Sequence, residues 1–167
     1  ETLYYYDAIC QCMDTFTIED VAGSPVIDST TTGDMNSQIC FPDTQITDGS
    51  LAVASNMVYL DGKLYMIASL EEQETTYKEY SLVYYDIANR MFGTVGELPN
   101  EYNHITEETL AAYNGKLYLL GGFDYNTKEL STLVKVYNPQ AAVKWSNGIA
   151  LPSGRAAGKC IQIDNQL

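Results

Sequence analysis

The chain has 167 residues and a hydrophobic fraction of 46%, which is enough for a packed core and argues against disorder. Its formal net charge is −13, with nine acids and no Lys or Arg in residues 1–60, so nucleic acid and anionic lipid surfaces are excluded as favoured partners. No apolar run approaches the ~20 residues that cross a bilayer, and no membrane span is predicted. Cationic and neutral partners stay open.

Fourteen tyrosines, only five prolines and many β-branched residues favour strands over helices, so we expect an all-β chain. Residues 1–16 contain "LYYYDAICQCM", which is similar to "LVYYDIANRMF" at 82–92 and predicts the second half of a repeated unit. Residues 17–50 are rich in Ser, Thr, Asp and Gly and predict an inserted polar loop or linker. This loop lacks the regular oxygen spacing of a calcium site.

The rest of the chain repeats itself. "YLDGKLYMIASL" (59–70) matches "AYNGKLYLLGGF" (112–123) at an offset of 53 residues. Further pairs keep this register within one residue: Gly62 with Gly115, Tyr85 with Tyr137, Phe92 with Trp145, and Leu98-Pro99 with Leu151-Pro152. We therefore divide the chain into units at 51–104 and 105–155, and residues 156–167 restart the pattern as the beginning of a further, truncated unit.

Within each unit the hydrophobic period is two, as expected for strands. The best-preserved unit predicts strands at 109–113, 116–120, 132–137 and 143–146. Asn114-Gly115 is a two-residue turn that allows positive φ at both positions, and Asp61-Gly62 repeats it. Four antiparallel strands form one small sheet whose two faces need neighbours, which favours a propeller blade over a sandwich.

These residues together resemble the kelch repeat. The best copy runs from Asn114 to Arg155 and contains a glycine pair, a tyrosine, an aromatic residue on the fourth strand, Leu-Pro and an arginine: Gly121-Gly122, Tyr137, Trp145, Leu151-Pro152 and Arg155. The preceding copy is degenerate, with Ala68-Ser69 in place of the glycine pair and Ile105 in place of the arginine. The resemblance implies a partial β-propeller of four-stranded antiparallel blades with a binding face made of inter-blade loops.

Propellers close with ~4–8 blades, so two whole units with a partial unit at each end predict a fragment of a longer protein. The remaining blades are then expected as partners of this segment. Uncovered blade faces would expose more apolar surface than a soluble monomer usually tolerates.

Three residues are predicted to contact a ligand: His104, Tyr125 and Arg155. His104 is the single histidine and lies between two units, where a surface-loop role is the plainer alternative. Arg155 can bind an anion through its planar fork or make a structural hydrogen bond. Gly121-Gly122 is assigned a structural role, because a phosphate loop would feed a helix.

The acid pairs Glu71-Glu72 and Glu107-Glu108 are expected to face solvent. We predict no metal, cofactor or catalytic residue in this segment. For the cysteines Cys10, Cys12, Cys40 and Cys160 we expect buried thiols first and a disulfide second, since the ligand spacings of zinc sites are missing. Cys10 and Cys12 would share a strand face, and either could meet Cys40.

The function expected first is a non-catalytic binding or scaffold module for a protein or glycan. The alternative is part of a kelch-type enzyme acting on carbohydrate, such as a sugar oxidase or a sialic-acid mutarotase. A purely mechanical spacer is a third possibility. The acidity and the Ser/Thr/Asp-rich segment point slightly to a secreted or cell-surface location without excluding the cytosol.

Overall fold

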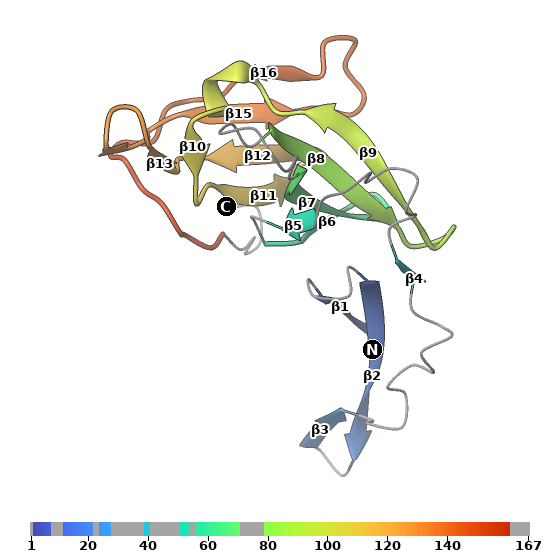
Figure 1. Cartoon of the computed structure of the whole chain (residues 1–167). Helices are drawn as coiled ribbons and strands as arrows, with labels where there is room; N and C mark the ends of the chain where they lie inside the picture. The colour runs from blue at the N-terminus through green and yellow to red at the C-terminus, as the bar shows by residue number, and fades with distance from the viewer. Residues whose placement is uncertain are drawn as a thin grey trace.

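The structure is a computed structural model that describes residues 2–7, 12–21, 24–27, 39–40, 51–53, 56–70 and 79–160, with side chains for 56–68 and 80–160. This part of the chain is all-β, with antiparallel sheets and a single 3-10 turn, η2 (Asn100–Tyr102), so the predicted fold class is confirmed at that level (Figure 1). Among the described residues, no helix is long and apolar enough to cross a membrane.

The first sheet contains β1 (Thr2–Asp7), β2 (Cys12–Val21), β3 (Ser24–Ile27) and β4 (Ile39–Cys40), with β2 pairing all three others. Residues 17–50 were predicted as a loop, but β2 continues to Val21 and the chain then forms β3 and β4. The physical reason is the alternation of β-branched and polar residues in "TFTIEDV", which suits a strand. The backbone register places Cys12 opposite Cys40, while Cys10 lies outside the described residues.

The first repeated unit forms one sheet. Two short strands, β5 (Leu51–Val53) and β6 (Val58–Leu60), pair with different parts of β7 (Lys63–Leu70), which pairs with β8 (Glu79–Asp86), which pairs with β9 (Met91–Glu97). Two short strands, β5 and β6, therefore share the edge of the sheet next to β7.

The second repeated unit forms a four-stranded sheet in the order β11 (Thr109–Tyr113), β12 (Lys116–Leu120), β15 (Val134–Tyr137) and β16 (Trp145–Asn147). The first two strands have the predicted bounds, and the last two are shorter and shifted by one or two residues. The turns have the expected conformation, since Asn114 and Gly115 have φ of 47° and 70°, and Asp61 and Gly62 have φ of 48° and 78°.

The two sheets share one register. Leu64 lies opposite Tyr85 in the first, and Leu117 lies opposite Tyr137 in the second. The aromatic residue on the outer strand pairs with that tyrosine in both cases, with ring centroids 5.1 Å apart for Tyr85–Phe92 and 5.3 Å for Tyr137–Trp145. The sequence repeat is therefore also a repeat of backbone pairing and side-chain contact.

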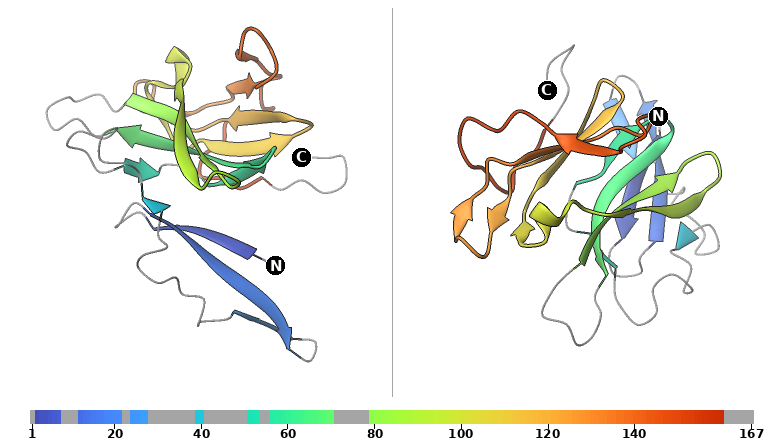
Figure 2. Two further views of the ribbon diagram at one scale, coloured as in Figure 1. Left: turned by 90° about the vertical axis from the view of Figure 1, so that its right-hand side faces the viewer. Right: turned by 90° about the horizontal axis from the view of Figure 1, so that it is seen from above.

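The core lies between the two sheets, which pack face to face (Figures 1 and 2). Its buried side chains come from both units and from η2 between them: Leu60, Tyr65, Ile67, Leu82, Leu98, Tyr102, Ile105, Leu110, Leu117, Leu119 and Tyr137. Each sheet on its own would leave this apolar face in water, and its burial is the main stabilising contribution.

One buried cation ties the connection between the units to the second sheet. The Lys135 ammonium group, only 9% exposed, contacts Glu101 Oε1 at 2.5 Å and Asn147 Oδ1 at 2.7 Å. The hydrogen bond from Lys135 lowers the pKa of Glu101. The corresponding position in the first unit, 52 residues earlier, is the buried Val83, so this charge pair is particular to the second unit.

Candidate functional site

The glycine pair follows directly after β12, and at this point the chain leaves the second sheet. Gly121 and Gly122 have φ of 60° and 111°. A Cβ on Gly121 would lie 2.3 Å from the Arg155 carbonyl oxygen, and one on Gly122 would lie 2.2 Å from Ile105 Cγ2. No other residue type fits these positions without a backbone shift. In the first unit Ala68-Ser69 replaces the pair, and there β7 continues to Leu70.

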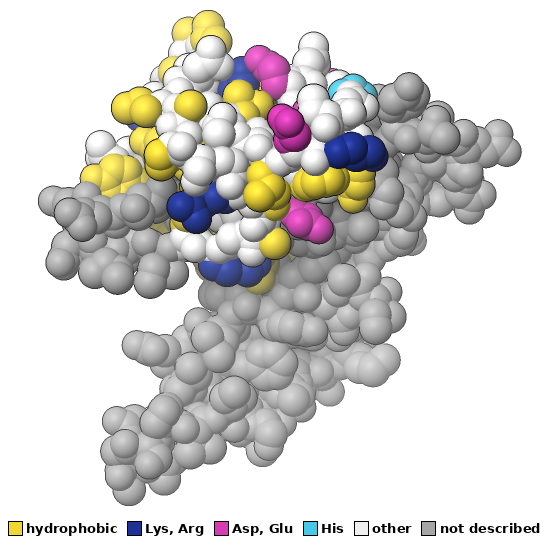
Figure 3. Space-filling model, turned by 90° about the vertical axis from the view of Figure 1, so that its left-hand side faces the viewer, with side chains coloured by type: hydrophobic (Ala, Val, Ile, Leu, Met, Phe, Trp, Pro, Cys, Tyr) yellow, Lys and Arg dark blue, Asp and Glu magenta, His cyan; other side chains and the backbone are white. Residues whose placement is uncertain are grey.

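The chain that leaves the sheet pairs with the segment before β11 to form a small three-stranded sheet at the same end of the molecule. It consists of β10 (Ile105–Thr106), β13 (Phe123–Asp124) and β14 (Glu129–Leu130), with β13 in the middle. We call this sheet, with the turn that joins β13 to β14, the platform. Figure 3 looks onto this end of the molecule and shows hydrophobic side chains interspersed with acidic and basic ones.

The platform brings two of the predicted ligand contacts together. The Tyr125 backbone N–H donates to the His104 carbonyl oxygen at 2.9 Å, so the two residues are neighbours across β10 and β13. His104 is exposed, and Tyr125 is 52% exposed. The Tyr125 ring meets the Phe123 ring edge-on at 5.3 Å, and the Lys128 ammonium group lies 5.5 Å from its centroid.

The turn that carries Tyr125 is fixed by its own hydrogen bonds. Asp124 Oδ1 accepts from the backbone N–H of Asn126 at 2.8 Å and of Thr127 at 3.3 Å, and the Lys128 N–H donates to the Asp124 carbonyl oxygen at 2.9 Å. Such an aspartate-centred turn is a common local structure. It presents an aromatic ring to solvent on a backbone that is already ordered.

Arg155 lies beside the platform at the start of a strap that we define as residues 155–158. Its carbonyl oxygen accepts from the Gly122 N–H at 2.7 Å, and its own N–H donates to the Ser131 carbonyl oxygen at 3.2 Å. The main chain of Arg155 therefore holds the glycine pair in place. The residue itself is exposed at the same end of the sheet as Tyr125.

The strap continues across the start of β11. The Ala157 N–H donates to the Glu107 carbonyl oxygen at 2.7 Å, and Thr109 Oγ1 donates to the Gly158 carbonyl oxygen at 3.0 Å. Both Glu107 and Ala157 have left-handed φ, 57° and 52° respectively. Two such non-glycine residues joined by a hydrogen bond store ~1–3 kcal/mol of backbone strain each, as is often found near functional sites.

The acid next to this strained residue departs from the sequence-based expectation. Glu107 is exposed as expected, but Glu108 is only 4% exposed, so the prediction that both face solvent is wrong. Both Glu108 carboxyl oxygens are buried without a hydrogen-bond partner. Burial raises the pKa of Glu108 to about 7, and the residue's own backbone N–H, which is near the carboxyl but does not meet hydrogen-bond geometry, opposes this effect.

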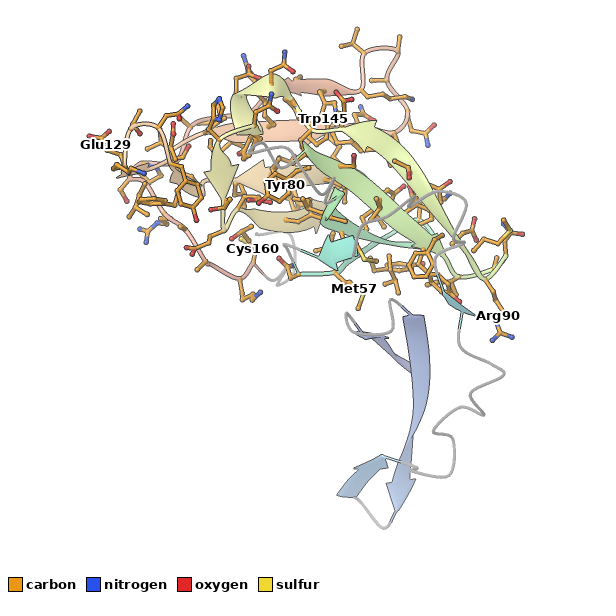
Figure 4. The ribbon with its side chains drawn as sticks, in the orientation of Figure 1. Met57, Tyr80, Arg90, Glu129, Trp145 and Cys160 are labelled. Atoms are coloured by element: carbon orange, nitrogen blue, oxygen red, sulfur yellow. The ribbon has the colours of Figure 1, made fainter. Side chains whose placement is uncertain are left out.

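Two phenol groups interact electrostatically with this carboxyl. Tyr80 at the start of β8 and Tyr102 of η2 both have pKa values raised first by burial and then by the charge of Glu108 (Figure 4 labels Tyr80). The Tyr102 hydroxyl is already engaged with backbone carbonyl oxygens, at 3.0 Å from Leu119 and 3.2 Å from Leu133. Tyr80 also interacts with Tyr125, which connects Glu108 to the platform.

The sequence contained no local signal for the burial of Glu108. Its side chain is buried in the structure, whereas the surrounding sequence "HITEETL" is typical of a polar loop. Within the described residues, no group of three or more His, Cys, Asp and Glu side chains is arranged to hold a metal ion. The acid pair Glu71-Glu72 and the Asp-containing segment 28–38 lie outside the described residues.

Comparison with known proteins yields a match to solved structures only. No family model matches the chain, and no curated protein matches it. The solved structure described as "Structure of YjhT" is similar with a TM-score of 0.60 and 14% sequence identity over 93% of this chain. The match covers 49% of the YjhT chain, so this chain spans about half of its length. The likeness supports the β-sheet fold.

Proposed function

We propose that this chain contributes kelch-type blades to a β-propeller and acts as a non-catalytic binding module for a protein or glycan partner. The propeller arrangement is supported by the repeat of register between the five-stranded sheet of the first unit and the four-stranded sheet of the second. The partner binds at the platform and the adjoining strap. The observation that carries this proposal is Tyr125, an exposed aromatic ring held on a prearranged turn.

The chemistry of the platform suits recognition. Tyrosine offers a large contact area with few rotatable bonds, which makes it a frequent energetic centre of protein interfaces, and its flat face also stacks on sugars. Leu130, 53% exposed on β14, adds apolar area beside the ring. His104 supplies a polar group at the rim, and Arg155 supplies a charged one.

Photocrosslinking tests the platform directly. We would place p-benzoylphenylalanine at position 125, and at Tyr59 as the matched control, since Tyr59 is equally exposed, at 62%, but lies on β6 away from the platform. The expected result is a covalent adduct with a protein partner from position 125 only. A glycan array probed with the wild-type chain and with Tyr125→Ala covers the second ligand class. The proposal would be refuted if no protein crosslinks specifically from position 125 and if any glycan binding is the same in wild type and Tyr125→Ala.

Glu108 favours one alternative function, part of a carbohydrate-active enzyme. A buried carboxyl with a pKa of about 7 is suited to proton transfer at neutral pH, because both of its protonation states are populated there. The test is turnover or mutarotation of reducing sugars by the wild-type chain, compared with Glu108→Gln. Sugar turnover that is lost in Glu108→Gln and kept in Tyr125→Ala would favour the enzyme function over the binding module.

A further inference from the structure

Three buried oxygen atoms without hydrogen-bond partners lie within three consecutive residues. They are Thr106 Oγ1 and the two carboxyl oxygens of Glu108, and the described part of the chain has no other such side-chain atoms. A buried polar atom without a partner costs ~1–3 kcal/mol, and more if it is charged. This concentration at one position indicates that the oxygens serve something other than the stability of the isolated chain.

The repeat shows that the fold does not need a carboxyl here. Residues that build the sheets recur at the 52- or 53-residue offset, whereas the counterpart of Glu108 is Ser55. The backbone around Glu108 is nevertheless held firmly, with Glu107 bonded to the strap and Thr109 bonded to Gly158. A non-repeating acid on a fixed and strained backbone is what a ligand site requires.

The atoms present define the complementary group. All three oxygens can accept hydrogen bonds, and no described Lys or Arg contributes to the pKa of Glu108. The two phenol groups that interact electrostatically with this carboxyl, Tyr80 and Tyr102, carry no positive charge that could compensate it. The net charge of −13 draws cations to the chain and repels anions. A neutral sugar hydroxyl would not compensate an ionised carboxylate in this setting.

We propose that Glu108, with Thr106, forms a recognition site for the guanidinium group of an arginine side chain on a partner protein. The inference rests on the proposed binding function and names the chemistry that the partner presents beside the platform. A guanidinium carries five N–H donors on a planar cation, so two can bond the carboxylate and a third the threonine hydroxyl. Because the three oxygens are buried in the structure, binding of this group requires the packing over them to open locally.

The test uses a charged probe and its uncharged counterpart. The wild-type chain, labelled with ¹³C at glutamate carboxyl carbons, is titrated with N-acetylarginine methylamide and with N-acetylcitrulline methylamide, which has nearly the same shape without the charge. The Glu108 resonance is assigned by its absence in Glu108→Gln. The control variant is Glu107→Gln, because Glu107 is the exposed neighbour. Galactose serves as a neutral hydroxyl probe.

The expected result is a shift of the Glu108 resonance with the arginine probe, none with citrulline or galactose, loss of arginine binding in Glu108→Gln, and retention in Glu107→Gln. Binding should also strengthen about tenfold between about pH 6 and about pH 8, because the ionised fraction of a carboxyl with a pKa of about 7 rises by that factor. The other titratable groups that face this carboxyl or adjoin it are Tyr80, Tyr102 and Glu107. The two phenols stay neutral over this range, and the pH dependence should vanish in Glu108→Gln.

Equal shifts with arginine and citrulline, a response to galactose alone, no response to any probe, or arginine binding that survives in Glu108→Gln would each overturn the inference. The proposed function is judged separately by crosslinking from position 125. A partner that crosslinks there and binds Glu108→Gln as tightly as wild type would leave the binding module standing and remove the guanidinium site.

Discussion

Replacing Glu108 by glutamine should make the chain more stable at neutral and alkaline pH. The pKa of this carboxyl is raised from 4.5 to about 7 in the folded state, so ionising it in place is ~3 kcal/mol less favourable than ionising it in the unfolded chain. Glutamine has nearly the same shape and stays neutral at every pH. It therefore resembles the protonated acid in the folded chain and avoids the buried charge.

The sign of the pH dependence follows from proton binding. Below about pH 4.5 both states carry the proton, and the stabilising contribution is complete. Between about pH 4.5 and 7 the unfolded chain loses its proton first, so the free energy of unfolding falls as the pH rises. Above about 7 it levels off. We expect a total loss of ~3 kcal/mol for wild type over this window that is absent in Glu108→Gln.

The measurement is urea unfolding at about pH 4.5, 6 and 8, followed by the fluorescence of Trp145, the only tryptophan of the chain, which packs on the buried Tyr137. Asp86 and Glu101 do not interfere, since their pKa values are lowered and they destabilise the fold only at more acidic pH. Glu107→Gln should keep the wild-type slope. Parallel curves for wild type and Glu108→Gln, or a wild type more stable than Glu108→Gln at about pH 8, would refute the reasoning.

Two further changes test the packing around the site. Gly121→Ala should destabilise the chain by more than ~2 kcal/mol in urea unfolding, because its Cβ would overlap the Arg155 carbonyl oxygen. The control Gly115→Ala, where φ is positive but the space is open, should cost only ~1 kcal/mol. Equal losses in the two variants would contradict this account of the glycine pair. Glu101→Ala should lower the free energy of unfolding by ~1–2 kcal/mol, because the buried Lys135 side chain then keeps only Asn147 as a partner. The loss stays small because Glu101 is exposed and solvent can replace it. An unchanged melting temperature would contradict this stabilising role of Glu101.

The repeat made the second unit predictable because its strands and turns are determined by local sequence. The alternation of hydrophobic residues placed β11 and β12 at their observed bounds, and Asn114-Gly115 determined the turn between them. The last two strands were predicted too early. Val134 begins β15 two residues after the predicted start, because the chain first returns from the platform through Ser131, which bonds Gly122.

The platform and the buried acid depend on contacts between distant residues, and the sequence carries little information on those. His104 and Tyr125 become neighbours only because β10 pairs with β13 across the connection between units. The residues around Glu108 in the sequence are typical of a polar loop, yet its side chain is buried and interacts electrostatically with Tyr102 of η2 and Tyr80 of β8, which are distant in the sequence or in another strand. One signal was available, since the acid interrupts the repeat where its counterpart is a serine.

The two units differ at one pair of residues, and this difference coincides with a difference in strand topology. Where Ala68-Ser69 stands, β7 runs on and pairs with β5 and β8 to its end at Leu70. Where Gly121-Gly122 stands, the strand stops, the strap closes over it and the chain is available to build the platform. The glycine pair therefore acts through the backbone: it supplies no side chain, and its conformation lets the chain leave the sheet and form the turn that carries Tyr125.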